Sequence, residues 1–362
     1  MFKFNQLDSV HLEITSNCQA SCPMCIRNVN GSAINNRYQI KSWTIDEFKT
    51  IMNNDVLTQL KGIIFCGNLG DPVINDDLLK MVEHIDLINP EIYVNIHTNG
   101  SMRTPQWWKS LASSLPKNHN VIFALDGLSD THSIYRIGTN FEKIIENASA
   151  FISEKGNAEW AFITFKHNQH QIDQAKAMSK KLGFNTFQVK NSTRFIGEPR
   201  LQVRDKAGNF KYFLEPADNV ELKYIDTTIL NNYKDIVKNS EIDCIVKKNK
   251  SVYIDHLGDV YPCCWIGSPP FTYHNLDDGA HLIRQEIDKE YQEMLKELGG
   301  KSQINSISRP LQEIINDIKW QSIWEMIWKD KKSITCARTC GIVDKKFSQP
   351  RHQFSDRYNF NG

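Results

Sequence analysis

The sequence predicts an α/β fold, with a partial (β/α)6 barrel of the TIM type followed by a small C-terminal α+β domain. Strand-like and helical stretches alternate through six units between residues 8 and about 193. Such β/α units in series form a parallel sheet that curls toward a barrel, with the crossover helices outside. Beyond residue 243 the alternation gives way to a hairpin pattern and five of the nine cysteines, which sets this part of the chain apart.

The six predicted strands are short apolar runs, and helical patterns lie between them. The strands cover residues 10–15, 62–66, 92–97, 121–126, 160–165 and 186–189. Thr44 and Glu47 have the spacing of a capping box, which begins a helix that continues through Met52. Apolar residues recur at helical spacing in residues 76–85, 141–152 and 171–182. Because functional groups of such a barrel gather at the C-terminal ends of its strands, we expect a site there.

Length and composition limit the classes of protein to which this chain can belong. A chain of 362 residues, 40% of them hydrophobic, allows two domains and a sizeable core. The formal net charge of +1 gives no electrostatic reason to expect nucleic acid or a membrane as partner. No run of 18 apolar residues occurs, and the N-terminal residues lack the apolar region of a signal peptide. We therefore expect a cytoplasmic protein, in which an odd number of cysteines indicates metal ligation.

Three cysteines directly follow the first predicted strand. Cys18, Cys22 and Cys25 have the spacing C-x3-C-x2-C. Three thiolates on one loop can hold three irons of a cubane [4Fe–4S] cluster, which leaves the fourth iron without a protein ligand. A structural zinc site more often uses four ligands in two short pairs, and no Cys or His follows closely enough here. A disulfide would leave one thiol over and would need an oxidising compartment.

This motif at the end of a first strand resembles the radical S-adenosylmethionine (radical SAM) enzymes. In that family the open iron chelates the amino and carboxylate groups of SAM. Reduction of the cluster then cleaves SAM to a 5′-deoxyadenosyl radical, which abstracts a hydrogen from the substrate. The resemblance covers residues 8–190 and 244–341, and it implies [4Fe–4S] and SAM as cofactors.

The ends of the next strands resemble further elements of the family. Residues 67–72, with the pattern G-x-x-G-D-P, resemble its Gly-Gly-Glu-Pro loop for the SAM amino group, with Asp71 in place of the usual Glu. Taken alone, this pattern and the Asn99-Gly100 pair are equally plain turns. Asp126 and Arg136 are alternatively a structural ion pair. The implied cofactor contacts are Gly67, Asn68, Gly70, Asp71, Pro72, Asn99, Asp126, Arg136 and Asn168.

Three other residues near these strand ends are expected to have no ligand. Cys66 is expected to be a buried, inert thiol at the end of the second strand. His167 and His170 are possible metal ligands by residue type, but their spacing beside the start of a helix is a weak signal for a metal site. We expect both to be solvated.

The C-terminal cysteines predict a second cluster. Residues 252–264 form a predicted β-hairpin that delivers Cys263. Together Cys244, Cys263, Cys336 and Cys340 supply the four thiolates of a complete auxiliary [4Fe–4S] cluster. This layout resembles the twitch domain, the shortened relative of the SPASM domain, which needs more cysteines than the five present here. Cys264 is spare or exchanges with Cys263, and a zinc site from the same four cysteines is the alternative.

The remaining segments are a connection, an insertion and a tail. Residues 194–243, with Gly197, Pro199 and Pro216, are expected to be loops that leave the barrel. The insertion, at about 265–335, contains two predicted helices, at 280–298 and 310–329. Its tryptophans, Trp320, Trp324 and Trp328, line an aromatic pocket or, as we favour, attach the helix to the barrel. The expected divisions are 1–193, 194–243, 244–345 and a tail at 346–362.

Taken together, these features predict a radical SAM oxidoreductase that oxidises a C–H bond of a small molecule. An auxiliary cluster beside a substrate radical can accept its second electron, and a reductant such as flavodoxin or ferredoxin is implied. A peptide- or protein-modifying maturase is the alternative, although only 17 residues precede Cys18, so no fused leader-binding domain is expected. An iron–sulfur electron-transfer protein would need no SAM loop. The sequence does not indicate the catalytic residue.

Overall fold

The computed structural model describes residues 1–32, 35, 37–192, 194–195, 200–218, 227–268, 281–329, 332–342 and 354–360, with the side chains of 227–231, 281–282 and 354–355 excepted. Gly197 and Pro199, on which the predicted connection partly rests, lie outside the described residues. Within these ranges no helix is both long enough and apolar enough to cross a membrane.

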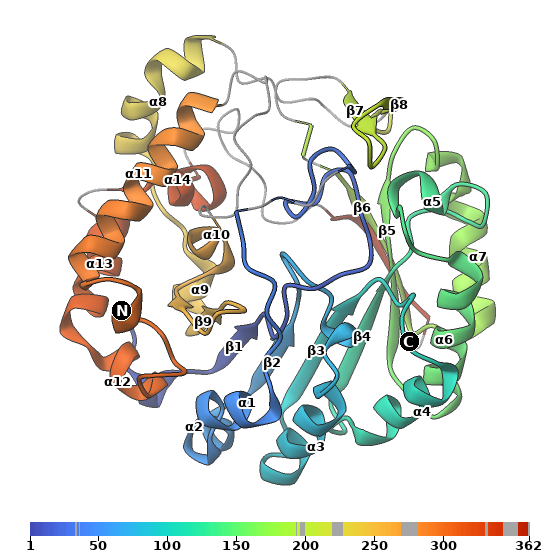
Figure 1. Ribbon diagram of the computed structural model, residues 1–362, viewed down its shortest axis with the longest axis horizontal. Coiled ribbons are helices and arrows are strands. Elements are labelled where there is room, and N and C mark those ends of the chain that lie inside the picture. The colour runs from blue at the N-terminus through green and yellow to red at the C-terminus, as the bar shows by residue number, and fades with distance from the viewer. Residues whose placement is uncertain are drawn as a thin grey trace.

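A mostly parallel nine-stranded sheet forms the centre of a mixed α/β fold (Figure 1). Its order is β10-β9-β1-β2-β3-β4-β5-β6-β11, so the six predicted strands are present and adjacent in chain order. They are β1 (Ser9–Leu12), β2 (Gly62–Phe65), β3 (Tyr93–Thr98), β4 (His119–Ala124), β5 (Ala158–Thr164) and β6 (Thr186–Asn191). Each pairs in parallel with the next, which confirms the predicted β/α succession.

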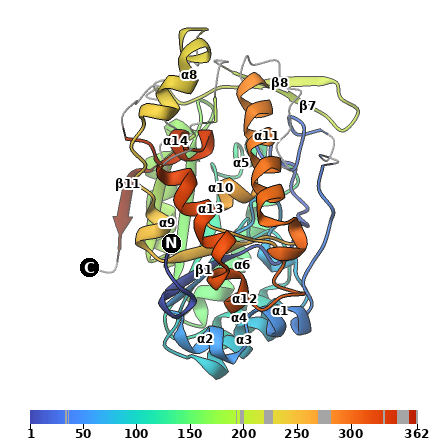
Figure 2. The same ribbon diagram turned by 90° about the vertical axis from the view of Figure 1, so that its left-hand side faces the viewer.

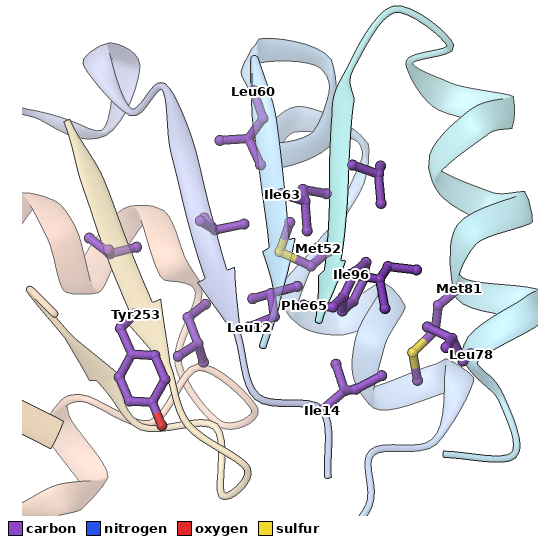
Figure 3. Close-up of a cluster of buried hydrophobic side chains, with 14 of the residues drawn as sticks. Leu12, Ile14, Met52, Leu60, Ile63, Phe65, Leu78, Met81, Ile96 and Tyr253 are labelled. Atoms are coloured by element: carbon purple, nitrogen blue, oxygen red, sulfur yellow. The ribbon is translucent and has the colours of Figure 1, made fainter. Parts of the chain in front are cut away.

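Helices connect these strands and cover one face of the sheet. They are α1 (Ile45–Ile51), α2 (Asn54–Gln59), α3 (Leu78–Ile88), α4 (Pro105–Ser114), α5 (His132–Tyr135), α6 (Phe141–Ser153) and α7 (Ile172–Leu182), with the 3-10 turns η1 (Phe4–Gln6), η2 (Pro72–Ile74) and η3 (Gln169–Gln171). The predicted capping box of Thr44 and Glu47 is present at the start of α1. Leu12, Phe65 and Ile96 are fully buried with residues of α3 such as Met81 (Figure 3).

Strand residues alternate between this helix-covered face and the other face of the sheet, which we call the inner face. The inner face carries polar residues where the helix-covered face carries apolar ones: His11, Glu13, Cys66, His97, Asp126 and Lys190. Burial lowers the pKa of Lys190 on β6. Lys190 also lies close enough to Cys66 and Asp126 for their charges to raise its pKa by a smaller amount. The C-terminal ends of distant strands therefore face one another.

The C-terminal part of the chain adds strands to both edges of the same sheet. The predicted hairpin is present as β9 (Ser251–Ile254) and β10 (Val260–Tyr261), and β9 pairs in parallel with β1. At the opposite edge β11 (Phe354–Asn359) pairs antiparallel with β6. This strand lies in the stretch expected to be a tail, and it is held by pairing with β6 and by the ion pair of Arg357 with Glu159, contacts far away in sequence.

The connection after β6 contains regular structure that the sequence prediction missed. It forms an antiparallel hairpin, β7 (Leu201–Arg204) and β8 (Phe210–Leu214), and the helix α8 (Thr227–Asn239). The Asp205 carboxylate accepts hydrogen bonds from the backbone of Ala207 and Asn209, both at 2.9 Å, and Gly208 has φ +88°. An Asx turn with a left-handed glycine thus closes this short hairpin.

A layer of helices covers the β9 side of the sheet (Figure 2). Its members are α9 (Ile245–Lys248), α10 (Cys264–Gly267), α11 (His281–Leu298), η5 (Lys301–Gln303), α12 (Leu311–Asn316), α13 (Ile318–Lys329) and α14 (Ile334–Cys340). The single helix predicted at 310–329 is broken at Asp317, whose extended backbone and carboxylate begin α13 instead. Trp320 and Trp324 are fully buried in the main core, which agrees with the packing interpretation.

Candidate active site

The loop after β1 carries Cys18, Cys22 and Cys25 as free thiols. Cys22 is buried and the other two are half-buried. The backbone N–H of Cys25 donates to the carbonyl of Cys22 at 2.9 Å, which closes a turn between them. Arg27 donates to the carbonyl of Ala20 at 3.1 Å and so fixes the loop from inside.

Burial makes two of these thiols, Cys18 and Cys22, poor acids. It raises the pKa of Cys22 to about 11, although the nearby Arg136 guanidinium acts in the opposite direction. It also raises the pKa of Cys18 well above its usual range. Such thiols keep their protons at neutral pH unless a metal ion displaces the proton. Buried thiols that bind a metal lose their protons in this way.

The loop at residues 67–72 lies directly over this cysteine loop. A Cβ on Gly67 would lie 1.4 Å from the Gly70 carbonyl oxygen, and a Cβ on Gly70 would lie 2.0 Å from that of Thr15. Both glycines are therefore required by close backbone approach. The Cys25 Sγ lies 4.0 Å from the Asn68 carbonyl oxygen, and the buried Asn68 Nδ2 has no hydrogen-bond partner among the described atoms. The structure thus forms a glycine-lined cradle beside the thiols.

Asp71 joins this cradle to the end of β3. Its Oδ1 accepts from Thr98 Oγ1 at 2.8 Å and from the Val73 backbone at 3.2 Å. Its Oδ2 accepts from the Asn99 backbone at 2.7 Å and also from the Asn99 side chain. Because four donors surround the carboxylate, Asp71 orients its neighbours. Asn99 Nδ2 in turn lies 3.7 Å from the Cys18 Sγ.

The ion pair of Asp126 and Arg136, one of the two interpretations of these residues, is present. Arg136 Nε donates to Asp126 Oδ2 at 2.5 Å, and the Ile163 backbone donates to Oδ1 at 2.6 Å. Burial raises the pKa of Asp126, against the opposing effect of Arg136. The positive charge of Arg136 also acts on the Cys22 thiol, where it opposes the rise in pKa that burial causes. The pair therefore brings the end of β4 to the cysteine loop.

Asn168 lies at the end of β5 and is fully buried. Its Oδ1 accepts from the Phe165 backbone at 2.7 Å and its Nδ2 donates to the Ile163 carbonyl at 3.0 Å. Both polar groups thus close the local turn. His170 is exposed, as expected, whereas His167 is half-buried and stacks on Phe165 with ring centroids 5.4 Å apart. Burial lowers the pKa of His167 to about 4, so its ring is neutral at pH 7.

A second group of cysteines lines a cavity of about 290 Å³ between β9, α9, α10 and α14. The thiols around it are Cys244, Cys263, Cys264, Cys336 and Cys340. Cys336 and Cys340 are one turn apart on α14 and so share a face. Burial raises the pKa of Cys263 and of Cys336, and neighbouring thiols raise both further. In the described part of the chain, no three Cys, His, Asp or Glu side chains converge on a position for one metal ion.

Cys264 differs from Cys263 in its surroundings. The side chains that affect the Cys264 thiol are Cys66, Asn68 and Glu13, which lie toward the glycine cradle. Those that affect Cys263 include Cys264 and Cys244, and Cys263 itself affects Cys336. Cys264 therefore lies between the two cysteine groups.

Sequence reasoning missed the polar residues of the inner face. Burial lowers the pKa of His11 to about 4 and that of His97 to about 3, and raises the pKa of Glu13 to about 7. Tyr253 of β9 also belongs here, with its ring centroid 4.9 Å from that of His11. A usable signal was present, because His11 and Glu13 alternate with buried apolar residues within one strand.

Comparison with known proteins assigns the N-terminal part of the chain. Residues 12–174 match the family model of the radical SAM superfamily. This segment is similar in sequence to radical SAM domains. The match begins in β1, contains the three cysteines, the glycine cradle and the Asp126–Arg136 pair, and ends in α7.

Three known proteins are similar to this chain over most of its length. The tungsten-containing aldehyde ferredoxin oxidoreductase cofactor-modifying protein of Pyrococcus furiosus is 22% identical over 265 residues, which is 70% of each chain. Streptococcus suis SuiB bound to S-adenosylmethionine has a TM-score of 0.51 at 14% identity and covers 88% of this chain and 67% of its own. The anSMEcpe protein with bound AdoMet has a TM-score of 0.50 at 15% identity, over 92% of this chain and 88% of its own. At these identities the similarity establishes the fold of the radical SAM domain.

Proposed function

We propose that this chain is a radical SAM enzyme of the oxidoreductase type, which cleaves SAM reductively and abstracts a hydrogen from its substrate. The observation that carries this proposal is the glycine cradle against the cysteine loop, with the Asn68 carbonyl 4.0 Å from the Cys25 Sγ. When bound, the [4Fe–4S] cluster supplies the electron that cleaves SAM. Cys18, Cys22 and Cys25 would hold it, since their free thiols, one buried and two half-buried, are a donor set that iron deprotonates.

The cradle and the strand ends around it would bind SAM. The proposed contacts are Gly67, Asn68, Gly70, Asp71, Pro72, Asn99, Asp126, Arg136 and Asn168. Backbone carbonyls of the cradle suit an ammonium group. Asp71 and Asn168 would act by fixing backbone, because their side chains are committed to protein hydrogen bonds.

We further propose a twitch-type auxiliary cluster in the C-terminal cavity, with Cys244, Cys263, Cys336 and Cys340 as ligands. Two features support it. The cavity is large for a single ion, and its thiols do not converge on one point. A cubane takes each thiolate at a different iron, whereas zinc draws its ligands onto one centre. The position of Cys264 between the cysteine groups favours Cys263 as the ligand.

Oxidation of a small molecule at a C–H bond is the substrate class that we favour. The inner face, lined by the buried Glu13 and the half-buried His11, His97 and Lys190, is a polar surface beside both cysteine groups, and a partial barrel would enclose it. Peptide or protein modification is the second candidate. It is favoured by the likeness to anSMEcpe with bound AdoMet and Cp18Cys peptide, at 16% identity and a TM-score of 0.50. We place the enzyme in the cytoplasm, with a flavodoxin or ferredoxin as reductant and no nucleic acid or membrane partner.

Anaerobic reconstitution tests the proposal. The protein is loaded with iron and sulfide, reduced with dithionite and incubated with SAM, and 5′-deoxyadenosine is quantified by chromatography. We expect about eight irons per chain and formation of 5′-deoxyadenosine. The matched control is the triple variant Cys18→Ala, Cys22→Ala, Cys25→Ala, which should retain about four irons and form none. SAM cleavage by that variant would refute the assignment.

A further inference from the structure

Glu13 is a fully buried acidic residue that immediately follows β1 on the inner face. Its flanking residues, Leu12 and Ile14, are buried in the hydrophobic core against the helices. Its backbone N–H donates to the Ile254 carbonyl of β9 at 3.0 Å. The backbone of Glu13 is therefore fixed by its bond to β9 before the side chain makes any contact.

The carboxyl group of Glu13 joins two parts of the molecule that are far apart in sequence. Its Oε1 accepts from the backbone N–H of Leu69 and, at 3.2 Å, from that of Gly70. Its Oε2 accepts from the Tyr253 hydroxyl. Leu69 and Gly70 belong to the glycine cradle, whereas Tyr253 belongs to β9 beside the cysteine cavity (Figure 3). One side chain thus connects the cradle to the C-terminal segment.

The geometry of the peptide bond gives this contact a consequence. The N–H and the C=O of a trans peptide unit lie in one plane and point in opposite directions. Because the Leu69 N–H points down to Glu13, the Asn68 carbonyl of the same unit points away, toward the Cys25 side of the cradle. Gly70 leaves little room for another arrangement, since even a Cβ added to it would lie 2.0 Å from the Thr15 carbonyl oxygen.

We propose that Glu13 is a positioning residue that aims the cradle carbonyls at SAM, and that Tyr253 holds Glu13 in this orientation. SAM binding then depends on the docking of β9, although no atom of β9 needs to touch SAM. This inference rests on the proposed function, because it assigns SAM to the cradle.

Two measurements test it with four single variants and one double variant. Glu13→Leu removes the acceptor of two buried amides, Glu13→Gln keeps one acceptor oxygen, and Tyr253→Phe removes only the hydroxyl. The matched control is Glu159→Gln, a buried acid of β5 that bonds Asn120 and Arg357 instead of the cradle. The first measurement is amide hydrogen exchange in the protein without SAM, read at Leu69 and Gly70. The second is SAM affinity of the anaerobically reconstituted protein by equilibrium dialysis, at matched iron content.

We expect Glu13→Leu to speed exchange at both amides and to weaken SAM binding about tenfold or more, since buried amides lose their acceptor. Glu13→Gln should give exchange rates and a SAM affinity between those of Glu13→Leu and the wild type. Tyr253→Phe should weaken SAM binding several-fold. In the Glu13→Leu background Tyr253→Phe should have no further effect, because Tyr253 acts through Glu13. Glu159→Gln should match the wild type in both measurements.

The outcomes separate this inference from the proposed function. If the wild-type protein binds no SAM, the proposed function fails, and so does the assignment of the cradle carbonyls. If the wild type binds SAM but Glu13→Leu leaves exchange and affinity unchanged, the inference alone is overturned. Additive effects of Tyr253→Phe and Glu13→Leu would also overturn it, because they would show that Tyr253 acts by another route.

Discussion

Arg136 Nε lies 2.5 Å from Asp126 Oδ2, and this ion pair is buried at the end of β4 beside Cys22. A buried ion pair affects stability more than a surface salt bridge does when one partner is removed, because the remaining charge is then desolvated and unpaired. The pair also joins β4 to β5, since Asp126 accepts from the backbone N–H of Ile163 near the end of β5. It is thus both structural and adjacent to the cysteine loop.

Removal of either partner should destabilise the protein strongly. We expect Asp126→Ala and Arg136→Ala each to lower the free energy of unfolding by about 3 kcal/mol. The double variant should lose less than the sum, because no unpaired charge remains. Urea unfolding of the metal-free protein, followed by tryptophan fluorescence, checks this. Simple additivity would contradict the interaction.

Gly70 should tolerate no side chain. A Cβ there would lie 2.0 Å from the Thr15 carbonyl oxygen, so Gly70→Ala must move the cradle away from the cysteine loop. We expect loss of SAM binding by at least an order of magnitude with little loss of iron at the three cysteines. Gly62→Ala is the control, since its Cβ would meet only ordinary contacts at 3.6 Å. Equal SAM affinity in both variants would show that the cradle does not need close approach.

His132 should make stability depend on pH. Its ring is buried, and burial, assisted by Arg136, lowers its pKa to about 3 from an ordinary value of 6.5. The unfolded chain binds a proton below pH 6.5 and the folded chain does not, so this contribution is complete above pH 6.5 and is lost as pH falls toward 3. Between pH 6.5 and 5 the loss is about 2 kcal/mol. His132→Gln should show a correspondingly flatter stability profile by urea unfolding at each pH, whereas an unchanged slope would refute this role.

The auxiliary site should be needed for oxidation and not for SAM cleavage. We expect Cys336→Ala with Cys340→Ala to retain about four irons and to form 5′-deoxyadenosine. Oxidised product should be absent, because the substrate radical has lost its electron acceptor. Iron analysis, Mössbauer spectroscopy and product chromatography check this. Undiminished product with the second cluster absent would contradict the proposed role.

Cys263 and Cys264 should behave differently despite being neighbours. We expect Cys263→Ala to lose about half of the iron and Cys264→Ala to keep it, since the Cys264 thiol lies beside Asn68 and Cys66. Cys66→Ala should also keep its iron. Loss of iron from Cys264→Ala alone would reverse the assignment of the ligand.

Local patterns predicted the local elements well and the long-range contacts poorly. The six parallel strands follow from apolar runs between helical patterns, and the capping box at Thr44 fixed the start of α1. The break at Asp317 was missed because a continuous apolar stripe hides a change in helix direction. β11 was missed because its partner, β6, is distant in sequence. That each group of cysteines binds an iron–sulfur cluster stays a prediction.

The site was predictable where motif spacing carries the chemistry, and unpredictable where contacts bring distant residues together. Spacing predicted Cys18, Cys22 and Cys25 as cluster ligands, and the family resemblance predicted the glycine cradle as the SAM loop. It could not reveal that Asp71 binds Thr98 and Asn99, because that contact depends on how two strand ends meet. Nor could it connect Glu13 with Tyr253, which only the pairing of β1 with β9 brings together.

The placement of β9 and β11 at the two edges of the sheet bears on how the protein is made. Ser9 of β1 pairs with Ser251 of β9, and β6 pairs with Phe354–Asn359 of β11. During synthesis on the ribosome, the first and sixth strands therefore emerge long before the strands that cover them. Each exposes unpaired backbone groups in that interval, which is a template for aggregation. We expect the nascent chain to need protection by a chaperone until its last residues leave the ribosome, and a fragment ending before residue 251 to be insoluble when it is expressed alone.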